Sequence, residues 1–176
     1  MATLVAILLV LGLGLLAFMR WRSVGEPAPG LGDATREERI AARRLGFAPK
    51  PEQDPLEAVG DPRLAAMGVV AAMAEIDGPL DADETDQLVV EAQVTFDIDK
   101  PLADSLVIVA LWLLQRSSDR MDLIARLAAL VAAKAGGGAA PDLLRMAAAA
   151  ATFAGPADRE AEAALEVIRQ AFGVNA

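Results

Sequence analysis

The chain has 176 residues and a net charge of −9, and it contains no cysteine, histidine or tyrosine. Without cysteine it has no disulfide framework and no thiolate nucleophile. Without histidine it lacks the usual zinc ligands and the base of a Ser-His or Cys-His pair. We therefore expect a protein that is not an enzyme, with no catalytic residue and no cofactor.

Residues 2–19 form an uninterrupted stretch of 18 uncharged, mostly apolar residues. A helix spanning a ~30 Å hydrocarbon core needs roughly 20 residues, so this stretch suffices if Arg20, Trp21 and Arg22 lie at the interface. Tryptophan and arginine are suited to that position. The sequence thus predicts a transmembrane anchor over residues 1–22.

A cleaved signal peptide is the alternative for this segment. Such a peptide carries positive charge before the apolar run and small residues after it. Here the basic residues follow the run, and Met1-Ala2-Thr3 has no basic side chain. We therefore favour a retained single-pass anchor in the cytoplasmic (inner) membrane, with the N-terminus outside and the C-terminal domain in the cytoplasm by the positive-inside rule.

Charge divides the rest of the chain. Residues 20–50 carry seven basic and four acidic side chains, whereas residues 51–176 carry nine basic and twenty-one acidic ones. A basic collar beside a membrane span suits anionic headgroups. The acidic remainder would be repelled by nucleic acid, so we expect no nucleic-acid partner.

Residues 23–60 are rich in proline and glycine and predict a basic juxtamembrane linker. One short helix is expected in it at Arg36–Leu45, with the capping-box spacing of Thr35 and Glu38 before it and Gly46 after it. Two interpretations stay open: a solvated linker helix, or a helix lying on the membrane surface through Ile40, Ala41 and Leu45.

From residue 61 the pattern is helical, and no window shows the alternation of a strand. We expect an all-α fold, a compact bundle of about six helices within residues 61–173. The nine apolar residues Leu106–Leu114 are predicted to form its central buried helix. The six helices are expected at about 64–76, 81–96, 102–115, 119–136, 141–155 and 156–173.

An internal repeat relates residues 67–91 to residues 144–168 at a shift of 77. Both segments predict a helix, a Gly-Pro turn and a second helix with aspartate three residues after the glycine. We interpret them as two helical hairpins packed with pseudo-symmetry.

The stretch from Ala74 to Glu84, AEIDGPLDADE, resembles the tellurite-resistance TerB-like domain family. That family has an alanine-rich helix, an Asp-Gly turn, a hydrophobic residue and an acidic start to the next helix, often followed by a second such hairpin. The resemblance covers roughly residues 61–173 and implies an all-helical, stress- or envelope-related module. The second hairpin departs from the pattern, because Ala154-Gly155 replaces Asp-Gly.

An anchor followed by such a domain is also similar to the front part of membrane-anchored DnaJ-like co-chaperones. Their J domain depends on a His-Pro-Asp turn, and this chain has no histidine. Because the histidine of that turn is missing, we expect no J-domain activity in this chain.

Four carboxylates, Asp77, Asp81, Asp83 and Glu84, fall within eight residues. Clustered oxygen ligands suit Ca²⁺ or Mg²⁺, although the spacing is not that of an EF-hand. The preferred interpretation is structural: Asp81 caps the next helix, and Asp83 and Glu84 meet the positive end of its dipole. Contact with a partner is the third possibility.

Together these features predict a membrane-tethered protein-interaction module with an acidic cytoplasmic surface. The alternative is a divalent-cation-responsive module that binds Ca²⁺ or Mg²⁺ near Asp77–Glu84. The partner protein, the pathway and the oligomeric state do not follow from the sequence.

Overall fold

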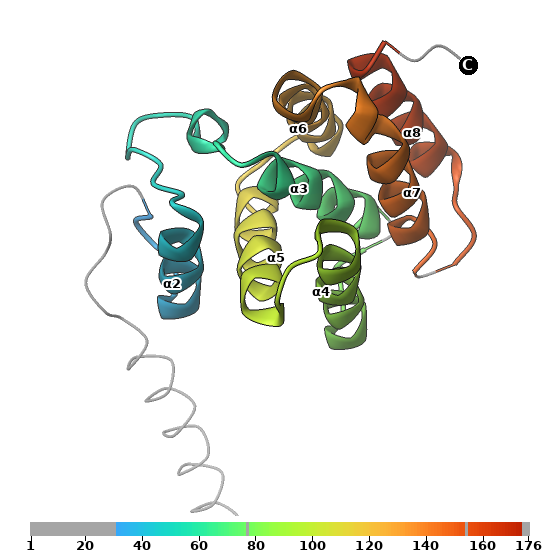
Figure 1. The fold of residues 1–176 in the computed structure, drawn as a ribbon. Coiled ribbons are helices and arrows are strands. Elements are labelled where there is room, and N and C mark those ends of the chain that lie inside the picture. Colours follow the sequence, from blue (N-terminus) through green and yellow to red (C-terminus); the bar gives the residue numbers. More distant parts are fainter. Residues whose placement is uncertain (1–30, 77, 154, 174–176) are drawn as a thin grey trace, which may run out of the picture.

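The computed structural model describes residues 31–76, 78–153 and 155–173 (Figure 1). This part of the chain is a bundle of seven α-helices with two short 3₁₀ turns, and it contains no strand. The all-α prediction is therefore confirmed, as are six helices beyond residue 61. The elements are α2 (Arg36–Leu45), η1 (Pro55–Ala58), α3 (Pro62–Ala74), α4 (Ala82–Phe96), α5 (Lys100–Leu114), α6 (Arg120–Ala135), η2 (Gly137–Ala139), α7 (Ala140–Ala150) and α8 (Arg159–Ala171).

Helix α3 is the centre of the bundle, with every residue from Leu64 to Ala74 buried. It packs against α4, α5, α6 and α7. Its glycine and alanines allow neighbours to approach closely: a Cβ on Gly68 would lie 2.7 Å from Leu127 Cδ1 of α6. The sequence analysis instead placed the central helix at Leu106–Leu114. That stretch lies in α5, which is largely buried but is covered mainly by α2, α3 and α4.

Helix α2 packs on α5, and Figure 1 shows α5 between α2 and α4. Ala41 and Ala42 are buried in this contact. The helix is therefore part of the packed bundle, which differs from a freely solvated linker helix. The face of α2 that packs on α5 consists of small side chains, so the hydropathy of the sequence did not predict this contact. The core extends through the preceding and following segments by way of Leu31, Ala34, Phe47, Leu56 and Val59.

Two arginines hold α2 antiparallel to α5. Near the end of α2, Arg44 Nη1 donates to Pro101 O at 2.7 Å and to Ser105 Oγ at 2.9 Å. At the opposite end, Arg116 stacks over the Trp112 ring at 3.8 Å and pairs with Asp33. Trp112 belongs to the stretch Leu106–Leu114 that is predicted to be buried, and its side chain is 2 % exposed.

The predicted capping box of α2 is present, and aspartates cap several further helices. Thr35 and Glu38 form a capping box on α2, and Gly46, at φ +66°, ends that helix. Asp99 accepts from Leu102 N at 3.0 Å and caps α5. The same arrangement begins α3 at Asp61, α6 at Asp119 and α8 at Asp158.

The two Gly-Pro turns of the internal repeat have similar backbones. Gly78 has φ +149° before α4, and Gly155 has φ +158° before α8. Asp81 and Asp158, three residues after each glycine, both cap the following helix. The repeat in the sequence thus corresponds to a repeated local structure.

No helix in the described part of the chain is long and apolar enough to cross a membrane. The predicted anchor, residues 1–22, lies outside the described residues, as do Asp77 and Ala154.

Candidate interaction groove

A groove lies between α4 and α7 in the described part of the bundle. Its floor is apolar, since Val70 and Met146 are buried beneath it and Phe153 is half-buried at its α7 end. The lining residues are Val70, Asp83, Asp86, Gln87, Val90, Glu91, Met146, Ala149 and Phe153.

Two valines on α4 face solvent: Val90 lines this groove, and Val94 lies one helical turn further along α4. Val90 is 57 % exposed and Val94 is 74 % exposed, although both are in the middle or last turns of a well-formed helix. Their i, i+4 spacing puts them on one face, opposite the buried Leu88 and Ala92. A second apolar stripe on a helix that already buries its first has no use in folding, which points to an external contact.

The charge around these valines is entirely negative on α4. This helix has no basic residue, and Asp83 and Asp86 are exposed on the groove side. Within the described residues neither aspartate forms an ion pair. Asp83, Gln87, Val90 and Val94 follow at i, i+4, i+7 and i+11, so the acidic and apolar positions form one continuous stripe.

Arg145 of α7 connects α7 to α4 beside the groove. Its Nη1 lies 2.6 Å from Glu91 Oε1, and its Nη2 donates to Thr95 Oγ1 at 2.7 Å. This clamp fixes the spacing of α4 and α7 and neutralises Glu91. The free carboxylates are therefore those of Asp83 and Asp86, towards the start of α4.

The residues of the predicted acidic cluster have two different roles in the structure: some cap α4, and one lines the groove. Asp81 Oδ1 accepts from Glu84 N at 2.8 Å, and Glu84 Oε2 accepts from Asp81 N at 2.9 Å, which is a complete capping box. The capping interpretation of Asp81 is thus confirmed. Asp83 lines the groove instead. Asp77 lies outside the described residues, and among the rest no group of three or more carboxylates is close enough to hold a metal ion.

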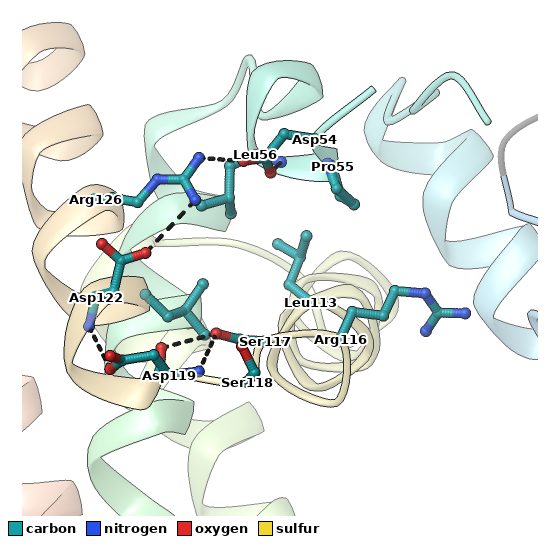
Figure 2. A pocket seen from close by; sticks show the side chains of 11 residues that line it. Asp54, Pro55, Leu56, Leu113, Arg116, Ser117, Ser118, Asp119, Asp122 and Arg126 are labelled. Atoms are coloured by element: carbon teal, nitrogen blue, oxygen red, sulfur yellow. Dashed lines mark hydrogen bonds and ion pairs between the residues drawn. The ribbon is translucent and has the colours of Figure 1, made fainter. Parts of the chain in front are cut away.

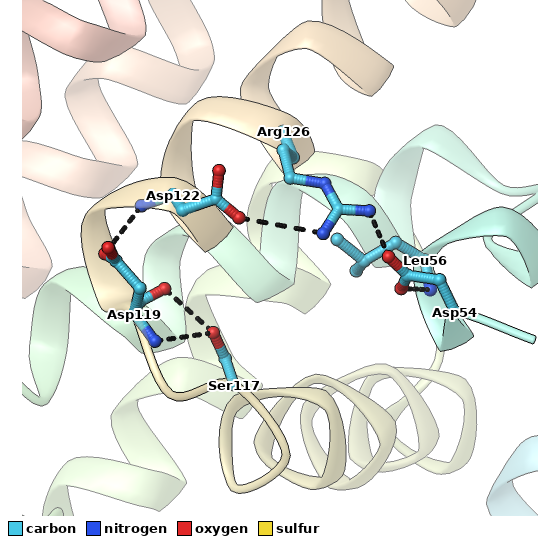
Figure 3. A network of polar contacts seen from close by, with 6 residues as sticks. All are labelled: Asp54, Leu56, Ser117, Asp119, Asp122 and Arg126. Carbon is cyan, nitrogen blue, oxygen red and sulfur yellow. Dashed lines mark hydrogen bonds and ion pairs between the residues drawn. The ribbon is translucent and has the colours of Figure 1, made fainter.

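A second hollow lies between η1 and the turn from α5 to α6 (Figure 2). Its polar groups bind one another, as Figure 3 shows. Arg126 pairs with Asp54 and lies 3.6 Å from Asp122 Oδ2. The hydrogen bond from Arg126, with that from Leu56 N, lowers the pKa of Asp54 below its ordinary value of 3.8.

Two further polar residues of this hollow, Asp119 and Ser117, are also engaged in hydrogen bonds within the protein. Asp119 accepts from Asp122 N at 3.0 Å and so caps α6. Ser117 Oγ donates to Asp119 O at 2.8 Å, so this hydroxyl is engaged with the backbone and has no adjacent base. We interpret the network as a tie that holds η1 to α6.

Sequence reasoning found the caps but missed the groove. The available signal was the pair Val90 and Val94, which lies off the face formed by Leu88, Val89 and Ala92. Only the packing of α7 beside α4 makes Val90 of that pair part of a groove wall.

Comparisons with known protein families, with curated proteins and with solved structures give no match. The structure alone therefore defines the class, an all-α helical bundle with an acidic, apolar-floored groove.

Proposed function

We propose that the chain is a membrane-tethered protein-interaction module without enzymatic activity. Its groove between α4 and α7 would receive a basic, amphipathic helical segment of a partner protein. The observation that carries this proposal is the stripe on α4, where carboxylates that form no ion pair with any described residue accompany the exposed Val90 and Val94.

The chemistry of the stripe specifies the partner. Apolar side chains at i, i+3, i+4 and i+7 of a helix can cover the valines and the groove floor. Fully burying one valine contributes about 1.5–3 kcal/mol, so two valines supply a useful part of a micromolar affinity of about −8 kcal/mol. Lysine or arginine beside these anchors would meet Asp83 and Asp86, which favours a basic partner and speeds its association.

The membrane tether and the family assignment rest on sequence. Residues 2–19 and the basic residues after them support an anchor with the bundle on the cytoplasmic side. The residues from Ala74 to Glu84 support the TerB-like resemblance, and the paired Gly-Pro turns support two pseudo-symmetric hairpins. We include all three in the proposal.

Cation response is the second candidate function. Asp83 and Asp86, one helical turn apart on α4, are exposed carboxylates without an ion pair among the described residues. A divalent ion bridging them would neutralise the groove and weaken a basic partner. Engagement of Asp81 and Glu84 in the capping box leaves fewer ligands for such an ion, so we rank this function second.

Photo-cross-linking from the groove tests the proposal. A photoreactive residue replaces Val94 in the full chain expressed in its own membrane, and the attached peptide is identified by mass spectrometry. We expect a basic, amphipathic helical segment, whose yield falls several-fold when Asp83→Asn and Asp86→Asn are added.

The matched control carries the photoreactive residue at Ile40, which is 48 % exposed on α2. The same peptide should not attach there. An acidic or non-helical peptide at position 94, equal yield from position 40, or indifference to the two aspartates would overturn the groove assignment.

A further inference from the structure

We propose that the outward face of α2 lies against an anionic lipid surface and so orients the whole bundle, with the groove directed away from the membrane. This inference rests on the membrane tether of the proposed function. It adds a second interaction surface, with phospholipid headgroups as its ligand.

The outward face of α2 is a basic stripe around one apolar residue. Arg36, Ile40 and Arg43 are all exposed and follow at i, i+4 and i+7, which places them on one face. Ile40 is 48 % exposed, and within the described residues neither arginine forms an ion pair. Glu37 is the acidic side chain exposed beside them, so the stripe remains net positive. An apolar side chain flanked by arginines suits the boundary between headgroups and acyl chains.

The packing of α2 shows that the predicted membrane-facing residues were partly wrong. Sequence reasoning assigned Ile40, Ala41 and Leu45 to a membrane-facing side, but Ala41 is buried and Leu45 is half-buried against the core. Ile40 alone remains available, so contact with lipid depends chiefly on the arginines.

Because α2 is fixed to α5, a contact made by α2 positions the entire bundle. Arg44 binds Pro101 O and Ser105 Oγ, and Arg116 binds Asp33 at the other end of the helix pair. The helix therefore transmits its orientation to the body behind it. This distinguishes the surface from a loose basic linker.

The charge distribution favours one orientation. The basic α2 and the acidic α4 lie on either side of α5 (Figure 1). An anionic membrane attracts each nearby arginine and repels Asp83 and Asp86, and both effects act within a Debye length of about 8 Å at physiological salt. The bundle would thus turn its α2 side to the lipid and its groove to the cytoplasm.

The position of α2 in the chain fits this arrangement. Sixteen residues separate the uncharged stretch 2–19 from Arg36, and they span at most about 55 Å when fully extended. The intervening residues 20–35 carry two basic and two acidic side chains, so the net positive charge of the surface comes from α2 itself.

The absence of cysteine allows a direct test with one fluorophore. The full chain carrying Ile40→Cys is labelled with an environment-sensitive dye and reconstituted into vesicles of phosphatidylcholine, alone or mixed equally with phosphatidylserine. The matched control is Val94→Cys, another exposed apolar position, on α4. Flotation of the vesicles measures the tether independently of the dye.

We expect the dye at position 40 to shift to the blue in the anionic vesicles only. The shift should disappear with Arg36→Gln plus Arg43→Gln, and also at about 1 M salt, where the Debye length falls to about 3 Å. It should persist with Lys134→Gln plus Arg159→Gln, two exposed basic residues on α6 and α8. The dye at position 94 should not respond.

The outcomes separate this inference from the proposed function. If the chain floats with both vesicles but position 40 is indifferent to phosphatidylserine, or position 94 responds equally, the lipid contact is wrong and the tether stands. If the chain does not float with either vesicle, the tether is wrong and this inference falls with it.

Discussion

Helices α3 and α4 have nearly the same length and are joined by one turn, yet the bundle uses them in opposite ways. In α3, eleven of thirteen residues are buried, whereas in α4 only Leu88, Val89 and Ala92 of fifteen are buried. The first helix supplies the packing on which the fold depends. The second is attached by a narrower face and keeps an exposed side that carries Asp83, Asp86, Val90 and Val94.

Truncation of a large side chain should separate the two helices most strongly. Met67 of α3 is fully buried, so Met67→Ala should lower the free energy of unfolding by about 2–5 kcal/mol through lost contacts and a cavity. Val94→Ala on α4 should change it by no more than about 0.5 kcal/mol. Chemical denaturation of the full chain in detergent measures both. Similar losses for the two variants would contradict the division of roles.

The close contact at Gly68 gives the next largest effect. Any Cβ there meets Leu127 Cδ1, which is itself buried and has little room to move. Gly68→Val should therefore cost about 1–3 kcal/mol through overpacking. The control is Gly60→Val, because a Cβ at Gly60 has no neighbour within 4 Å. A neutral result at Gly68 would show that α3 and α6 are less tightly packed than described.

Within α4, substitutions of the cap residue and of a groove residue should affect the stability of the fold differently. Asp81→Ala removes the acceptor for Glu84 N and should cost about 1 kcal/mol. Asp86→Ala should cost no more than about 0.5 kcal/mol, because this exposed side chain lines the groove and makes no cap. Thermal melting monitored by circular dichroism distinguishes them. An equal loss at Asp86 would give that residue a structural role.

These cases show what the sequence could predict. Caps such as Asp81 depend on residues three positions apart, so the pattern was sufficient. The central place of α3 was not predictable in the same way, because α3 and the apolar run of α5 are both rich in small and branched apolar residues. Which of the two helices is central depends on how many neighbouring helices pack against each, and this does not follow from local sequence. The docking of α2 depends on Arg44 and Arg116 meeting groups more than fifty residues away.

The tie between Asp54 and Arg126 should give a smaller, pH-dependent effect. The pKa of Asp54 is lowered, so its stabilisation is present above 3.8, the ordinary value, and is lost as pH falls through the lower folded-state value. Because the pair is partly exposed, Asp54→Asn should cost about 0.2–1 kcal/mol at neutral pH. That difference should shrink below pH 3.8. Asp142→Asn, at an exposed site, is the control. A cost that is constant with pH would mean that the charge of Asp54 is irrelevant.

The smallest expected effect is that of divalent cations. With Asp81 and Glu84 occupied as caps, millimolar Ca²⁺ or Mg²⁺ should leave the melting temperature of the full chain as it is with chelator. If a cation site exists, a cation concentration of a hundred times its Kd would stabilise the fold by about 2.7 kcal/mol. A clear rise that Asp77→Asn or Asp83→Asn abolishes would favour the cation-responsive function.

The central claim, that α4 and α7 form a docking groove, is tested most directly by affinity. The segment that cross-links from position 94 is synthesised as a labelled peptide, and its Kd for the full chain in nanodiscs is measured by fluorescence anisotropy. Val90→Asp should weaken binding at least tenfold, because about 1.4 kcal/mol of apolar burial is lost. Ala133→Asp, at an exposed apolar position on α6, is the control and should leave the Kd unchanged. Equal Kd values for Val90→Asp and the unaltered chain would contradict the account.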